Sequence, residues 1–73
     1  MEKYDEIFIA DLKLNKEELE TNPSRESLRQ WDSLAHLTLV ADIEDAYGIM
    51  LDPEDIMKFD SYEHGKEIVH KYC

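Results

Sequence analysis

The sequence is poor in the residues that cross-link chains, break helices or enter membranes. Its 73 residues include one cysteine, two glycines and two prolines. The lone Cys73 excludes a disulfide framework and fits a reducing compartment. No apolar run approaches the roughly 18 to 20 residues of a membrane helix, and the first residues show no apolar signal region. We therefore expect one cytoplasmic domain over residues 1–73, with no membrane span.

Basic residues are also scarce, and the middle of the chain has none. The sequence holds 18 Asp and Glu residues against 8 Lys and Arg, a net charge of -10. Between Trp31 and Met57 there are seven acidic residues and no Lys or Arg. Nucleic acid and anionic membranes bind basic surfaces, so both are poor partners for this chain. A basic protein partner is complementary to it.

The short chain also limits the class of protein. A chain of this size buries only about 60% of the surface that its unfolded form exposes. That is enough for one small core but not for a deep catalytic cleft. We therefore expect a monomeric carrier, adaptor or binding module rather than an enzyme.

Apolar residues at helical spacing predict an all-α fold, and no segment shows the sustained alternation of a strand. Gly48 is expected to end the second helix, because glycine readily takes the left-handed conformation of a helix C-terminus. Asp52 and Pro53 are typical of a helix start, and Ser61 is expected to cap the last helix. The four predicted helices are Lys3 to Leu12, Ser33 to Tyr47, the short segment from Pro53 to Lys58 or Phe59, and Tyr62 to Tyr72.

A long loop is predicted between the first two helices. The stretch from Leu14 to Gln30 is rich in turn residues and long for a loop in a small domain, so it must be pinned to the core. Leu19, Leu28 and Trp31 are the expected anchors. A short helical turn fits around Lys16 to Glu20.

The second predicted helix carries two apolar stripes at 100° per residue. Only one stripe can face a small core, and two interpretations of the other stay open. Leu34 and Leu37 pack under the long loop, or they form an exposed patch, edged by carboxylates, that docks a basic partner. The core stripe consists of Leu39, Val40, Ile43, Ala46 and Tyr47. The second stripe consists of Leu34, Leu37 and Ala41, with Glu44 and Asp45 one turn further on.

Ser33 stands where this helix begins, between an acid and a leucine. Asp32 is a suitable helix cap, which leaves the Ser33 hydroxyl pointing outward. A hydrolase would need a base and oxyanion donors, but no G-x-S-x-G elbow is present and His36 points toward the core stripe. Ser33 is then either an unmodified capping residue or the attachment point of a phosphodiester, whose charge the helix N-terminus favours.

The segment from Trp31 to Ile56, WDSLAHLTLVADIEDAYGIMLDPEDI, resembles the second helix, link and third helix of an acyl carrier protein. Asp32-Ser33-Leu34 matches the Asp-Ser-Leu attachment motif of that family. Ile43-Glu44-Asp45, followed by Tyr47-Gly48-Ile49, is similar to its Ile-Glu-Glu and Phe-Gly-Ile pattern. In length and helix order the resemblance covers nearly the whole chain.

The resemblance implies a four-helix bundle of acyl-carrier type that catalyses nothing itself. Ser33 would bear 4′-phosphopantetheine, attached by a phosphopantetheinyl transferase that uses coenzyme A and Mg²⁺. The thiol of this arm would carry an acyl group as a thioester. The other implied partners are an acyl- or aminoacyl-loading ligase and downstream pathway enzymes. These partners would dock on Leu34, Leu37, Ala41, Glu44 and Asp45, with Ile56 on the third helix.

Departures from the family's patterns narrow the implied role. Peptidyl carriers usually have a glycine-rich run before the serine, where Gln30-Trp31 stands here. Fatty-acid carriers often have an acid in place of Thr38 and a larger residue in place of Ala41. A specialised pathway with a polyketide-like, hydroxyacyl or aminoacyl intermediate is therefore favoured, and a D-alanyl carrier stays compatible. The competing hypothesis is an unmodified acidic adaptor that binds a basic protein partner through the Leu34/Leu37 face.

No metal site is predicted. His64 and His70 are expected to be solvated, and no Cys or His cluster joins them. Asp52, Glu54 and Asp55 lack the calcium-loop pattern and are interpreted as a helix start, with loose Ca²⁺ or Mg²⁺ binding as the alternative. Two methionines are predicted to fill the core, namely Met50 and Met57.

Overall fold

The computed structural model describes residues 2–73, and helices make up the whole of its regular structure. The prediction of an all-α fold is confirmed, and no strand occurs among these residues. The short helical turn predicted in the long loop forms a helix of its own, so the described chain has five helices rather than four. They are α1 (Glu2–Leu12), α2 (Lys16–Leu19), α3 (Ser33–Tyr47), α4 (Pro53–Lys58) and α5 (Tyr62–Tyr72).

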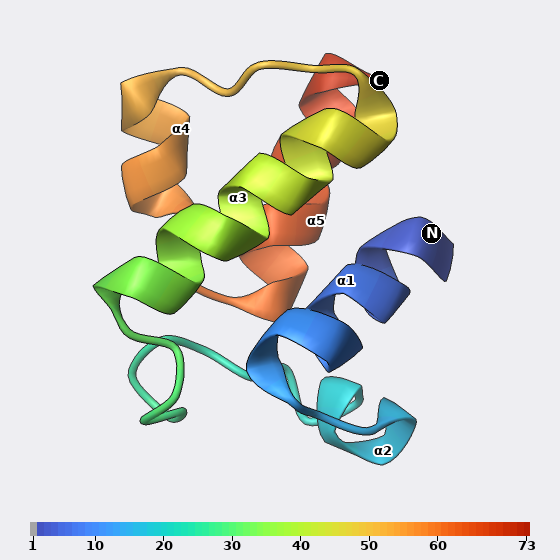
Figure 1. Ribbon diagram of the computed structural model, residues 1–73, viewed down its shortest axis with the longest axis vertical. Helices are drawn as coiled ribbons and strands as arrows, with labels where there is room; N and C mark the ends of the chain where they lie inside the picture. The colour runs from blue at the N-terminus through green and yellow to red at the C-terminus, as the bar shows by residue number, and fades with distance from the viewer. Residues whose placement is uncertain (1) are drawn as a thin grey trace.

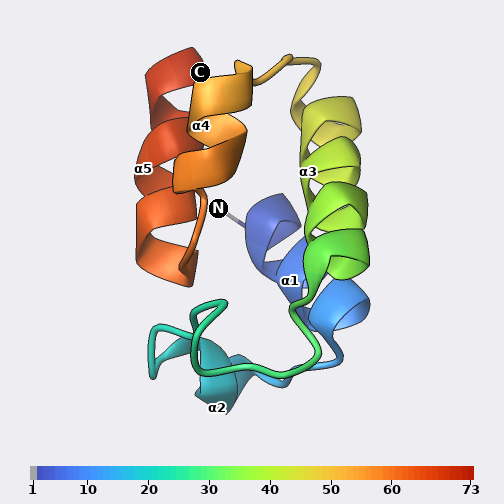
Figure 2. The same ribbon diagram turned by 90° about the vertical axis from the view of Figure 1, so that its left-hand side faces the viewer.

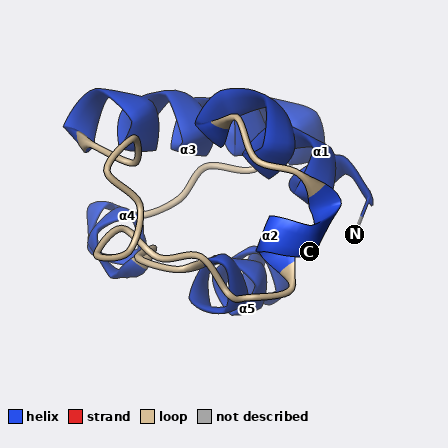
Figure 3. Cartoon of the chain, turned by 90° about the horizontal axis from the view of Figure 1, so that it is seen from below, coloured by secondary structure: helices blue, strands red, loops and turns tan. Residues whose placement is uncertain are grey.

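The helices form two sides around a shared core. Helices α1 and α3 pack against each other on one side, and α4 and α5 lie together on the other (Figures 2 and 3). The loop between α2 and α3 runs under one end of this arrangement, the end at which α3 begins (Figure 1). The N-terminal tip of α3 therefore lies beside a long irregular segment.

Local capping chemistry explains where α3 begins and ends and where α5 begins. The Asp32 carboxylate accepts a hydrogen bond from the N–H of Ala35, and Ser61 Oγ accepts one from the N–H of His64. Gly48 has a φ of 64°, a conformation that costs other residues strain, and it closes α3 as predicted. Asp52 differs from the prediction: it holds the N-cap position of α4, but its side chain makes no capping hydrogen bond.

Aromatic rings fill the core between the two sides. Phe8 packs edge-on against Trp31 and against Tyr62, with ring centroids 5.4 Å apart in both pairs. The Tyr4 hydroxyl is buried and donates a hydrogen bond of 2.6 Å to the carbonyl of Tyr62. Aromatic pairs add to the free energy gained by burial alone, so this cluster is a main source of stability. The largest fully buried side chains are Tyr4, Phe8, Phe59, Leu12, Leu39, Ile43 and Val69.

The long loop is pinned to the core largely as predicted. Leu19 and Trp31 are buried, and Leu28 is half-buried against the core. The loop is also tied to the start of α5 through its backbone. The N–H of Arg25 donates to the carbonyl of Asp60 over 2.9 Å, and the N–H of Tyr62 donates to the carbonyl of Pro23 over 2.8 Å.

The prediction that two methionines fill the core is wrong. Met50 and Met57 are 81% and 79% exposed, so neither fills the core. Asp55 lies in the first turn of α4, as predicted, but it is buried, and its carboxylate accepts hydrogen bonds from Lys71 Nζ and from the Tyr72 hydroxyl. These bonds hold the pKa of Asp55 below its ordinary value, and they fasten α4 to α5.

None of the helices in residues 2–73 has both the length and the apolar character required to cross a lipid bilayer.

Candidate functional site

Ser33 is the first residue of α3, and its side chain is exposed. Its hydroxyl makes no hydrogen bond to any of residues 2–73. The residue that caps the helix is its neighbour Asp32, whose Oδ1 lies 2.9 Å from the N–H of Ala35. Ser33 is therefore not the capping residue, and its hydroxyl is free for another purpose.

The backbone around Ser33 leaves room for an anion. The N–H of His36 donates to the Asp32 carbonyl over 2.8 Å, and the N–H of Ala35 is used by the Asp32 side chain. The N–H groups of Ser33 and Leu34 make no hydrogen bond within the part of the chain described. Free N–H groups and the positive end of the helix dipole both favour a negative group at this position. The local geometry thus fits a phosphodiester on the Ser33 oxygen.

The apolar patch next to Ser33 is open to solvent. Leu34 is 75% exposed and Leu37 is 61% exposed, so neither packs under the long loop. Ala41 and Asp45, further along α3, are exposed as well. An exposed group of large apolar side chains on a small protein is typical of a binding surface. Of the two interpretations left open by the sequence, the structure favours the exposed patch.

Two of the residues predicted to dock partners have contacts inside the protein. Ile56 is half-buried and packs on the edge of the core. Glu44 is half-buried, and its Oε2 accepts a hydrogen bond of 2.8 Å from the N–H of Leu51. This carboxylate thus anchors the link between α3 and α4. Its role in docking stays a prediction, with one of its oxygens already in use.

His36 lies on the inner side of α3, as predicted, and holds three segments together. It is 5% exposed. The indole N–H of Trp31 donates to His36 Nδ1 over 3.0 Å, and because indole is only a donor, Nδ1 must be the acceptor. The proton is then on Nε2, which donates to the carbonyl of Ile56 over 2.8 Å. Burial lowers the pKa of His36, the Ile56 hydrogen bond opposes this, and the charge of Arg25 lowers the pKa further.

Both ring nitrogens of His36 are hydrogen-bonded, which decides whether His36 could be the general base of a Ser33 hydrolase. A general base must reach the hydroxyl proton that it accepts. His36 directs its two nitrogens to Trp31 and Ile56, on the inner side of the helix, whereas the Ser33 hydroxyl is exposed. The two side chains therefore do not form a nucleophile–base pair.

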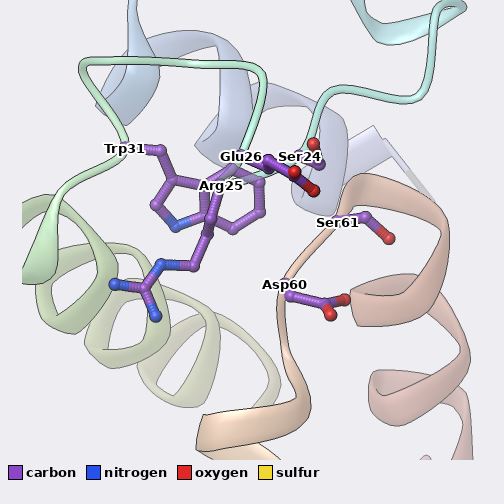
Figure 4. Close-up of a pocket in the computed structure, with 6 residues that line it drawn as sticks. All are labelled: Ser24, Arg25, Glu26, Trp31, Asp60 and Ser61. Carbon is purple, nitrogen blue, oxygen red and sulfur yellow. The ribbon is translucent and has the colours of Figure 1, made fainter.

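A hollow of about 520 Å³ lies at the same end of the molecule, between the long loop and the link from α4 to α5. Its walls carry one positive and two negative side chains, Arg25 against Glu26 and Asp60. In Figure 4 the Arg25 guanidinium points toward α3, away from the side chains of Glu26, Asp60 and Ser61. The lining residues are Ser24, Arg25, Glu26, Trp31, Asp60 and Ser61.

A second, smaller hollow of about 300 Å³ lies on the other side of the α3 start, against the end of α1. Asp11 belongs to its lining, and Oδ2 of this residue is buried without a hydrogen-bond partner in residues 2–73. Burial and the side chain of Asp42 raise the pKa of Asp11 to about 6. Asp11 therefore keeps its proton to a higher pH than an ordinary carboxyl group does.

The two histidines outside this region, His64 and His70, lie on α5. No group of three or more His, Cys, Asp or Glu side chains within residues 2–73 has the arrangement needed to hold a metal ion. His64 is half-buried, and its Nδ1 lies 2.9 Å from the Asp60 carboxylate, four residues earlier. His70 is exposed.

Comparisons with known proteins do not place the chain in a family: no protein-family model, curated protein or solved structure matches it. The functional argument therefore depends on the residues and the geometry described above.

Proposed function

We propose that this protein is a carrier of acyl-carrier type, bearing 4′-phosphopantetheine on Ser33. The observation that carries the proposal is the free, exposed hydroxyl at the first position of α3, directly after a separate capping residue, Asp32. A serine hydroxyl that neither caps its helix nor forms a hydrogen bond within residues 2–73 is available for modification. The Asp-Ser-Leu motif and the adjacent exposed leucines support the same conclusion.

The attachment reaction follows from the chemistry of a serine hydroxyl. Ser33 Oγ forms a bond to the phosphorus that carries pantetheine in coenzyme A. The pyrophosphate bond breaks, the nucleotide part of coenzyme A leaves, and the hydroxyl proton is released. A phosphopantetheinyl transferase with Mg²⁺ supplies the catalysis. Within the carrier, the free N–H groups of Ser33 and Leu34 and the helix dipole favour the negative charge that is added.

The group attached at Ser33 supplies a flexible thiol that carries an acyl, hydroxyacyl or aminoacyl cargo as a thioester. The protein itself contributes the surface that partner enzymes recognise. Leu34 and Leu37 offer an exposed apolar surface beside the attachment point, and the surrounding acids attract basic residues on partner enzymes. The proposed partners are the transferase, a loading ligase and the enzymes of a specialised pathway, for which the carrier works as a cytoplasmic monomer.

A second candidate function uses the same surface without modification. The exposed leucines and the absence of Lys and Arg from residues 31–57 also suit an acidic adaptor that binds a basic partner protein. The adaptor does not account for the free Ser33 hydroxyl, and for this reason we favour the carrier.

Incubation with a broad-range phosphopantetheinyl transferase and coenzyme A distinguishes the two candidates. The carrier is expected to gain one phosphopantetheinyl group by intact mass, and Ser33→Ala is expected to gain none. Thr38→Ala is the matched control, because Thr38 is another exposed hydroxyl on α3, four residues after Leu34, whose carbonyl it contacts. This variant should be modified like the wild type. An unchanged wild-type mass with an active transferase would favour the adaptor.

A further inference from the structure

Arg25 is an unusual cation in this protein. Among the eight Lys and Arg side chains, only those of Arg25 and Lys66 are half-buried, and the others are exposed. Lys66 lies over the ring of Tyr62, with its Nζ 5.2 Å from the ring centroid. The Arg25 guanidinium makes no hydrogen bond or ion pair with residues 2–73. A half-buried, unpaired guanidinium in a chain with net charge -10 calls for a partner from outside the chain.

The backbone holds Arg25 in place. Its N–H donates to the Asp60 carbonyl over 2.9 Å, and the neighbouring Ser24 pairs with Ser61 in an isolated β-bridge. The backbone of Arg25 is therefore fixed against the residues that precede α5. From there the guanidinium points toward α3 in Figure 4.

The electrostatics agree with this direction. The positive charge of Arg25 contributes to lowering the pKa of His36, which agrees with the direction of the guanidinium in Figure 4. His36 is three residues from Ser33 on the same helix. From Trp31 to Met57 the chain has no cation of its own, so a cation near the start of α3 must come from another segment. Arg25 and Lys13 are the two that line hollows there.

We propose that Arg25 is the counter-charge for the phosphodiester on Ser33, and that the hollow beside it receives the first part of the pantetheine arm. The inference deepens the proposed function and rests on it. A guanidinium is suited to this task because its planar set of N–H donors matches the oxygens of a phosphate. At the far end of the hollow, the carboxylates of Glu26 and Asp60 are acceptors suited to the amide N–H groups of pantetheine.

The hollow on the other side of α3 is a less suitable place for the phosphate. It is lined by the carboxylates of Asp11 and Asp32, and its one cation, Lys13, is exposed. Both hollows carry two acids and one cation, but Lys13 is exposed, whereas Arg25 is half-buried and therefore less hydrated. The half-burial of its cation thus favours the Arg25 side.

NMR of the apo and modified protein tests the inference without an activity assay. The Nε–Hε cross-peak of Arg25 is expected to shift when Ser33 is modified, and its exchange with solvent is expected to slow several-fold. The Nε–Hε cross-peak of Arg29 should not shift. Arg29 is an exposed arginine of the same loop, and the inference assigns it no contact with the modified Ser33. In phosphorus NMR, the resonance of modified Arg25→Gln should differ from that of the wild type, while modified Arg29→Gln should match the wild type.

The outcomes separate the inference from the function on which it rests. Intact mass is measured before any spectrum, and an unmodified Ser33 overturns both proposals. A modified protein in which the Arg25 cross-peak neither shifts nor exchanges more slowly overturns the inference alone. If only the signals of Gln30 and Thr38 shift, the arm lies in the other hollow. That result would also overturn the inference alone. The cross-peak measurement uses wild-type protein, so it holds even if Arg25→Gln does not fold.

Discussion

The indole N–H of Trp31 and Nδ1 of His36 form a hydrogen bond of 3.0 Å, and both side chains are buried. This bond fixes the neutral tautomer of His36 whose Nε2 binds the Ile56 carbonyl. One imidazole thereby connects the loop before Ser33, the first turns of α3 and the short helix α4. The geometry of the candidate site depends on His36 staying neutral.

The first prediction concerns pH. Because the pKa of His36 is lowered in the folded protein, its imidazole becomes protonated at a higher pH in the unfolded chain than in the folded one. The contribution of neutral His36 to the free energy of unfolding is therefore complete above the ordinary pKa of 6.5 and is lost as the pH falls below it. His36→Gln should be less stable than wild type by about 1 to 3 kcal/mol at about pH 7.5, since a buried Trp31 donor loses its partner.

Urea unfolding at several pH values measures this effect. The stability difference between wild type and His36→Gln should shrink as the pH falls from about 7.5 to about 5, because only the wild type loses this contribution. A difference that stays constant over this range would show that His36 is not held neutral by the fold.

The second prediction concerns the carboxyl pair of Asp11 and Asp42. The pKa of Asp11 is raised to about 6 from an ordinary value of 3.8, so its folded-state stabilisation is present at low pH and is lost as the pH rises through about 6. Asp11→Asn should melt at a higher temperature than wild type at about pH 8, and the two should converge near pH 4. Asp45→Asn removes one exposed negative charge from α3 and is the control. Equal gains from both variants would mean that net charge alone is responsible.

The third prediction tests the packing of α5. A Cβ at Gly65 would overlap the ring of Phe59 and the hydroxyl of Tyr4. Gly65→Ala should therefore destabilise the protein by about 1 to 3 kcal/mol or more, as overpacked cores do. Adding Phe59→Leu should recover part of this loss, giving a favourable coupling in a double-mutant cycle. Additive losses would show that the two positions are not in contact.

The fourth prediction concerns docking. Leu37 is 61% exposed, so Leu37→Asp should leave the melting temperature nearly unchanged. The same change should lower the efficiency of the transferase by an amount corresponding to about 1 to 3 kcal/mol, if Leu37 is a central contact. Ala10→Asp, on the exposed side of α1, adds the same charge and should have no such effect. Equal losses in the two variants would assign the effect to charge rather than to docking at Leu37.

Local chemistry accounts for what could be predicted from the sequence. Asp32, Gly48 and Ser61 act through hydrogen bonds or backbone angles within a few residues, and the helix ends that they mark are confirmed. Apolar spacing likewise identified Leu39 and Ile43 as core residues, and both are fully buried. These signals require no knowledge of what the helices pack against.

Features that depend on distant parts of the chain could not be predicted in this way. Asp55 is buried because Lys71 and Tyr72, about 16 residues later, bind its carboxylate. Met57 is exposed because α4 turns the opposite side toward α5, and one short helix carries too little periodicity to reveal this. The position of Arg25 depends on the path of an irregular loop. In the sequence, the only sign of a role was that Arg25 and Arg29 are the last cations before a long cation-free segment.

The most direct test of the account is peptide mass spectrometry after reaction with coenzyme A and a phosphopantetheinyl transferase. We expect a single phosphopantetheinyl group, with fragment ions placing it on Ser33. A protein that stays unmodified under conditions in which a known carrier is fully converted, or that is modified at another residue, would contradict the central claim.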